Sequence, residues 1–168
     1  MHALFVVSLW IHILAATTWI GGSVFLALVL VPTLRNPAWR DRGLELIRQV
    51  ARRFLWVVWT CFALLIVTGI FNLLVHEGGD PSLIASNQLW SSAYGRVLAW
   101  KLTFVGSILV LSALHDFVLG PVATRAAGAG AAGAGRLRLA VRWVGRLNLL
   151  LGLFVVGLGV ALGRGWPW

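Results

Sequence analysis

HILAATTWIGG, residues 12–22, places an ionisable imidazole inside an otherwise uninterrupted apolar run. Between Ala3 and Leu34 the chain carries no charge unless His12 is protonated, and this run is longer than the roughly 20 apolar residues that cross a bilayer. The stretch therefore predicts a transmembrane helix. An ionisable side chain within such a helix usually faces the interior of the protein and indicates a functional site.

The composition is that of a membrane protein. Of the 168 residues, 60% are hydrophobic and 11% are charged, and the mean hydropathy is +0.89, whereas about a quarter of the residues in soluble domains are charged. The net charge of +9 does not indicate nucleic-acid binding, because the basic residues lie between the hydrophobic runs, where membrane topology explains them. A single cysteine, Cys61, excludes a disulfide or a thiolate metal cluster within one chain.

Four apolar runs predict an all-α, integral membrane bundle of four transmembrane helices, over about residues 3–34, 54–75, 97–121 and 143–162. Arginines concentrate in the first and third connections, residues 35–53 and 122–142, which predicts that both loops are cytoplasmic. The chain is then a single multi-pass domain with both termini outside, in the cytoplasmic membrane of a bacterium. Residues 41–54 predict either a short interfacial helix or a cytoplasmic extension of the second span.

Polar residues gather at one depth in this topology. Counting outward from the arginines at about 1.5 Å per residue places His12, His76 and Lys101 near the outer boundary of the hydrocarbon. Thr68 and Asn72 continue the His76 face inward, where they can bond an imidazole or a ligand. The His12 face of the first helix is small, aromatic and polar, with residues at helical spacing: Ala15, Ala16, Trp19, Gly22 and Ser23.

This outer layer favours haem b, which helix bundles hold by histidine beside small and aromatic residues. His12 is the expected axial metal ligand and His76 its partner, with Lys101 near a propionate, as a proton donor or as the sixth ligand. The other cofactor-binding candidates are Trp19, Gly22 and Asn72. The prediction is a small membrane cytochrome, an oxidoreductase that transfers electrons or handles copper or porphyrin, with a quinol or a periplasmic protein as its redox partner.

Two alternatives stay open. Copper suits imidazole ligands and the layer opens outward, but the chain offers only Met1 and Cys61 as soft ligands, and they are far apart. The polar layer could instead bind nothing and stabilise helix packing. Deeper in the membrane, His115 and Asp116 lie at the level of Arg146 and Asn148 and are expected to lock the third helix to the fourth by salt bridges and hydrogen bonds. Glycines of the fourth helix suit a homo-oligomer.

The quoted first-helix stretch, TGIFN at 68–72, YGRVLAWKL at 94–102, Pro121 and RLN at 146–148 together resemble the CopD-type, copper-resistance D integral membrane family. That resemblance covers nearly the whole chain and implies copper transport across, or copper handling at, the inner membrane.

The first helix is also similar to the four-helix bacterial protoporphyrinogen oxidases of the HemJ type. In those proteins a histidine is followed by tryptophan and glycine at the spacing of His12, Trp19 and Gly22, and the third helix carries a lysine similar to Lys101. This second resemblance implies haem b binding and porphyrin redox chemistry. The sequence prediction is therefore haem b, with a CopD-like copper permease or copper-binding protein as the alternative.

Overall fold

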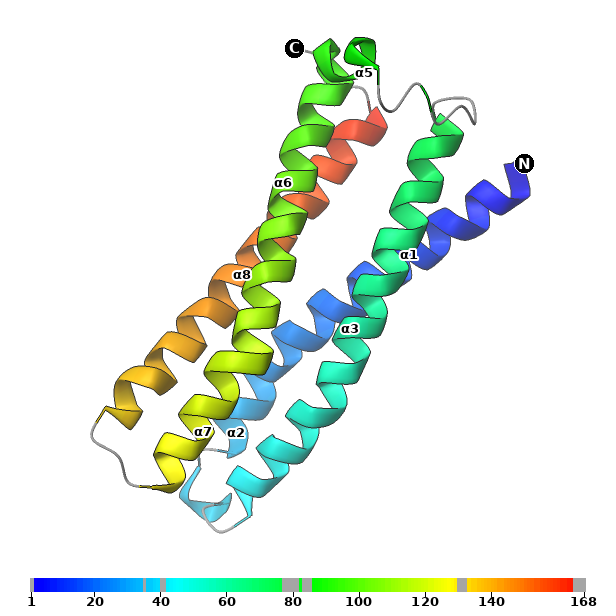
Figure 1. Cartoon of the computed structure of the whole chain (residues 1–168). Helices are drawn as coiled ribbons and strands as arrows, with labels where there is room; N and C mark the ends of the chain where they lie inside the picture. The colour runs from blue at the N-terminus through cyan, green and yellow to red at the C-terminus, as the bar shows by residue number, and fades with distance from the viewer. Residues whose placement is uncertain are drawn as a thin grey trace. The chain divides into compact units, whose positions relative to one another are not determined.

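The computed structural model describes residues 2–34, 36–39, 42–76, 82, 86–129 and 133–164, and every regular element in these ranges is helical (Figure 1). Four of its helices are long and apolar enough to cross a membrane: His2–Leu34, Glu45–His76, Ala93–Ala126 and Ala134–Arg164. The predicted all-α class with four membrane-spanning helices is confirmed. The chain divides into two compact units, Met1–Ala85 and Ser86–Trp168.

The first unit is an antiparallel pair of long helices. Its elements are α1 (His2–Phe25), a π-helical turn η1 (Leu26–Leu30), α2 (Val31–Leu34), a 3-10 turn η2 (Pro37–Trp39) and α3 (Gly43–His76). The interface of α1 with α3 contains the buried residues Ser8, Ala15, Trp19, Val58, Cys61, Phe62 and Thr68. Large apolar side chains such as Leu28 and Trp56 point outward, as expected of helices whose solvent is lipid.

The second unit repeats this plan. It contains α5 (Asn87–Ser91), α6 (Ala93–Ala113), a π-helical turn η3 (Leu114–Leu119), α7 (Gly120–Gly128) and α8 (Ala134–Arg164). Ser92 caps α6, because its hydroxyl accepts a hydrogen bond from the Gly95 amide at 2.9 Å. Phe104 of α6 packs edge-on against Phe154 of α8, with ring centroids 5.0 Å apart.

A proline accounts for each π-helical turn. Pro32 follows η1 and Pro121 follows η3. Proline has no amide hydrogen, and its ring crowds the carbonyl four residues earlier, so the helix before it widens to i→i+5 hydrogen bonds. The Val31 amide accordingly bonds to the Leu26 carbonyl, and the Gly120 amide to the His115 carbonyl.

The helices extend beyond the predicted spans at their basic ends. α3 begins at Gly43 rather than near residue 54, so residues 43–53 form an extension of the second span rather than a separate interfacial helix. α8 begins at Ala134 rather than near residue 143. Arginine and leucine are good helix formers, and a helix continues through them wherever the chain leaves the bilayer. Hydropathy marks the lipid-facing part of a helix and not its ends.

Candidate functional site

His12 is fixed by a hydrogen bond between the two helices of the first unit. Its Nδ1 lies 2.8 Å from Thr68 Oγ1, and the Thr68 hydroxyl donates its only hydrogen to the Leu64 carbonyl at 2.6 Å. The Thr68 oxygen must therefore accept from His12, so Nδ1 carries the hydrogen of the neutral ring. The lone pair is then on Nε2, the nitrogen that binds a metal when Nδ1 is held in this way.

Gly69 allows the imidazole to lie against the backbone of α3. A Cβ at this position would be 3.5 Å from His12 Cε1. Thr68 itself is only 7% exposed, so the hydrogen bond is shielded from water. The expectation that Thr68 bonds an imidazole is confirmed, and the imidazole is that of His12.

Two buried oxygen atoms without partners flank this pair. Ser8 lies one turn before His12 on α1, and Asn72 lies one turn after Thr68 on α3. Because the two helices run antiparallel, both residues lie on the same side of the His12–Thr68 contact. In the described part of the chain, neither Ser8 Oγ nor Asn72 Oδ1 has a hydrogen-bond partner. Buried polar atoms in native proteins are nearly always satisfied, so such a pair indicates a place for a bound water, ion or ligand.

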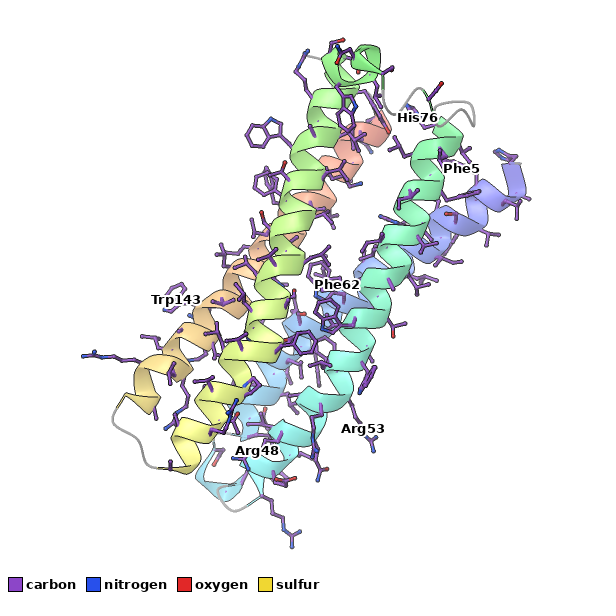
Figure 2. The ribbon with its side chains drawn as sticks, viewed as in Figure 1. Phe5, Arg48, Arg53, Phe62, His76 and Trp143 are labelled. Atoms are coloured by element: carbon purple, nitrogen blue, oxygen red, sulfur yellow. The ribbon has the colours of Figure 1, made fainter. Side chains whose placement is uncertain are left out.

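His76 is further along α3 than this polar group. It is the last residue of the helix and is exposed, and Figure 2 labels it at the opposite end of α3 from Arg48 and Arg53. Eight residues separate it from Thr68, which corresponds to about 12 Å of helix rise. In the first unit the structure joins His12 to Thr68, and His76 stands two turns away.

Trp19 packs against α3. Its ring meets that of Phe62 edge-on, with centroids 5.0 Å apart, and Phe62 meets Trp59 in the same way at 5.6 Å. Trp19 is 7% exposed and Phe62 3%, so this cluster forms the core of the unit. The small face of α1 therefore packs against a second helix at this level.

Gly22 also serves this contact. A Cβ there would lie 2.8 Å from Phe54 Cζ, whereas a Cβ at Gly21 would meet nothing within 4 Å. We expect Gly22→Ala to destabilise the protein by about 1–3 kcal/mol through overpacking. Gly21→Ala is the matched control, and we expect it to be neutral or stabilising by up to about 1 kcal/mol because alanine favours a helix. Thermal unfolding in detergent measures both, and equal melting temperatures for the two variants would contradict the contact.

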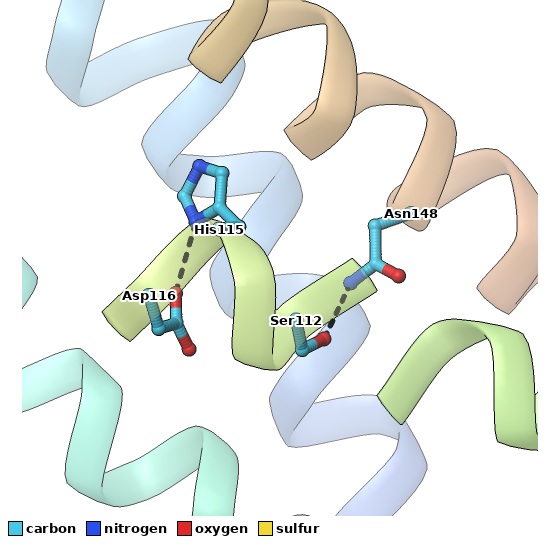
Figure 3. Close-up of polar contacts among 4 residues, drawn as sticks. All are labelled: Ser112, His115, Asp116 and Asn148. Carbon is cyan, nitrogen blue, oxygen red and sulfur yellow. Dashed lines mark hydrogen bonds and ion pairs between the residues drawn. The ribbon is translucent and has the colours of Figure 1, made fainter. Parts of the chain in front are cut away.

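The second unit has polar side chains at two levels between its helices. Near one end, a Cβ at Gly159 of α8 would lie 3.6 Å from Lys101 Nζ of α6. Deeper along α6, Asn148 Nδ2 donates to Ser112 Oγ at 2.8 Å, and His115 Nδ1 lies 2.9 Å from Asp116 Oδ1 (Figure 3). The predicted polar link between the third and fourth helices is thus present as the Ser112–Asn148 hydrogen bond.

Sequence inspection selected His12, Thr68 and Asn72 but missed Ser8, Gly69 and Phe62. The spacing of Ser8 and His12, four residues apart on one helix face, was an available signal. Gly69 and Phe62 carried no signal, because only the register of α1 on α3 makes them neighbours of His12 and Trp19. Within the described ranges, no group of three or more His, Cys, Asp or Glu side chains could hold a metal ion.

Comparisons with known proteins identify one family. The family model described as Copper resistance protein D matches residues 48–162. This match includes all of α6 and most of α3 and α8, and it leaves α1 with His12 outside. An uncharacterized protein of Aquifex aeolicus (strain VF5) is 32% identical over 160 residues, which cover 94% of each chain. No solved structure matches the chain.

Proposed function

Because the chain belongs to the copper resistance protein D family and is a multi-pass membrane protein, we propose that it handles copper ions within the membrane. The metal is its substrate, and His12 is the imidazole ligand that would hold it beside α3. The observation that carries this proposal is the His12–Thr68 hydrogen bond, in which Nδ1 donates to the Thr68 oxygen and Nε2 is the ring nitrogen that would bind a metal. Imidazole nitrogen is among the best protein ligands for copper.

The surrounding donors are oxygen atoms. Asn72 Oδ1 and Ser8 Oγ are buried beside His12 and lack partners in the described part of the chain. One nitrogen with oxygen donors suits Cu²⁺ better than Cu⁺, which prefers sulfur. Cys61 is seven residues before Thr68 on α3, about 10 Å of helix rise away. A site with few strong ligands also suits passage rather than storage, because a transported ion must leave as readily as it enters.

The basic end of α3 supports the proposed orientation. Arg48 and Arg53 lie at the end of the helix opposite to His76 (Figure 2), and positive residues stay on the cytoplasmic side. His12 and His76 are then nearer the outer face, with both termini outside. We assign the protein to the cytoplasmic membrane of a bacterium, where the lipid bilayer surrounds it and a quinol, a periplasmic redox protein or a second copy of the chain is its further partner.

Copper titration of the purified protein tests this function. We expect one bound Cu²⁺ per chain whose electron paramagnetic resonance spectrum shows nitrogen coupling from imidazole. His2 needs a control, because an N-terminal amine followed by an imidazole can also bind Cu²⁺; His2→Ala should leave the signal intact. A protein that binds no copper, or whose signal disappears with His2→Ala, contradicts the proposal.

Haem b is the second candidate, and the same imidazole favours it. A histidine that holds haem iron through Nε2 usually has its Nδ1 held by a hydrogen bond, and Thr68 would hold His12 in this way. The small face of α1 packs directly on α3 through Trp19 and Phe62, so the porphyrin does not fit between these two helices and would reach His12 from outside their interface. A bound haem would supply one-electron redox chemistry.

An absorption spectrum of the purified protein separates the candidates. A Soret band with sharp α and β bands after dithionite reduction supports haem b and a small membrane cytochrome. A colourless protein, expressed with ample haem available, that binds copper supports the copper function alone.

A further inference from the structure

The two units share one design that extends to individual hydrogen bonds. In each unit, the first membrane helix has a π-helical turn towards its end, closed by an i→i+5 hydrogen bond. The Val31 amide bonds to the Leu26 carbonyl in one unit, and the Gly120 amide bonds to the His115 carbonyl in the other. A proline follows each turn. Every one of these residues is 89 positions from its counterpart. At these positions the two units therefore follow the same plan.

The same offset relates His12 to Lys101. Each of these side chains lies against a glycine of the second helix of its own unit. A Cβ at Gly69 would be 3.5 Å from His12 Cε1, and a Cβ at Gly159 would be 3.6 Å from Lys101 Nζ. The two glycines are 90 positions apart. Lys101 thus occupies, in the second unit, the position that His12 occupies in the first.

Lys101 is the only lysine of the chain, which has 13 arginines. Lys101 lies within the membrane-spanning helix Ala93–Ala126. It is eight residues into α6, about 12 Å from the start of that helix. An ionisable group in such a position is costly without a counter-charge and indicates a function.

The described part of the second unit supplies no counter-charge near Lys101. No hydrogen bond or ion pair joins Lys101 Nζ to a residue in that part. The acidic residue in the described part of this unit is Asp116, which is 15 residues after Lys101, or about 22 Å of helix rise. The Asp116 carboxylate contacts His115. Arg96 and Arg164 lie towards the same end as Lys101, so this end of the unit is cationic.

We infer that Lys101 and Gly159 form a binding site for a phosphate-type oxyanion at the membrane boundary. Lysine binds phosphate as a compact charge with three donors. Nζ lies against Gly159, where a Cβ would be at van der Waals distance of 3.6 Å and a larger side chain would crowd the ammonium. Its source is either a lipid headgroup or free phosphate, and the two sources share this chemistry. The residues of this site are other than those proposed to hold copper or haem at His12.

The single lysine allows a direct test on the intact protein. Expression with ¹³C-lysine labels Lys101 alone, because the chain has no other lysine, and the Cε resonance beside Nζ then reports on the unmodified ammonium. The protein is held in a maltoside detergent, which has no phosphate. Inorganic phosphate and soluble short-chain phosphatidylglycerol are then titrated separately, each against sodium chloride of equal ionic strength. We expect a saturable shift of the Lys101 resonance.

The outcomes are distinct. Saturation with phosphatidylglycerol alone identifies a lipid headgroup, and saturation with inorganic phosphate identifies the free anion. Gly159→Val should weaken the response by about tenfold or more, because it removes room for a charge-assisted hydrogen bond. Gly157→Val is the matched control, since a Cβ there meets nothing within 4 Å. The proposed site is wrong if phosphate shifts the Lys101 resonance no more than sodium chloride does. It is also wrong if Gly159→Val and Gly157→Val respond to phosphate equally.

Discussion

Replacing His12 with alanine is expected to weaken Cu²⁺ binding by about 100-fold or more and to remove the nitrogen coupling from the resonance spectrum. Loss of the ligand should exceed the 10- to 100-fold effect that is usual for residues that only orient a ligand. The remaining donors beside the site, Ser8 Oγ and Asn72 Oδ1, are neutral oxygens and hold copper poorly without a nitrogen. Equilibrium titration with a competing chelator measures the affinity.

His115→Ala is the matched control for this change. It also removes one imidazole from a membrane helix, but in the second unit, where His115 contacts Asp116. We expect its copper affinity to stay within about twofold of the unmodified protein, well inside the effect of losing a ligand. Equal losses for the two variants would mean that copper binding reports general damage, and no loss for His12→Ala would move the site away from α1. If haem is present, the same pair of variants tests the axial ligand by the Soret band.

Thr68→Val is expected to weaken copper binding by about 10- to 100-fold while every atom that could contact the metal stays in place. Valine matches threonine in shape but cannot accept the Nδ1 hydrogen. The imidazole then loses the partner that fixes its tautomer and orientation. The buried donor is left without that partner, so we also expect a loss of about 1–3 kcal/mol of stability.

Thr68→Ser separates the two parts of this effect. Serine keeps the hydroxyl that accepts from His12 and removes only a methyl group. We therefore expect nearly normal copper affinity with a small loss of stability, about 1 kcal/mol for a buried methyl. If Thr68→Ser and Thr68→Val lose the same affinity, packing rather than the hydrogen bond positions His12, and the tautomer argument is wrong.

The four membrane-spanning helices were predictable because each is an apolar run of sufficient length. The exact starts of the second and fourth helices were not. Residues 43–53 and 134–142 contain several arginines, and hydropathy cannot distinguish a helix that continues into water from a loop. The π-helical turns before Pro32 and Pro121 also left no clear signal, since a proline can kink, end or locally widen a helix.

The correspondence between these positions of the two units was not visible in the sequence for a physical reason. A lipid-facing surface accepts any large apolar residue, so equivalent positions in the two hairpins differ freely. Even the polar position changed its chemistry, from the imidazole of His12 to the ammonium of Lys101. The backbone bonds and the glycine contacts kept the register, because they depend on how close two helices come rather than on which side chains they carry.

What the sequence alone determined about this protein is its class: four apolar helices, the polar residues they carry, and the family that these patterns resemble. The tertiary structure decided which polar residues meet. Depth counted along the chain put His12 level with His76, whereas the packing of α1 on α3 joins His12 to Thr68. Hydropathy records only how deep a residue lies along the membrane normal. Register and rotation between two helices depend on side chains that interlock, such as Trp19 on Phe62 and Gly22 beside Phe54, and only the folded unit specifies them.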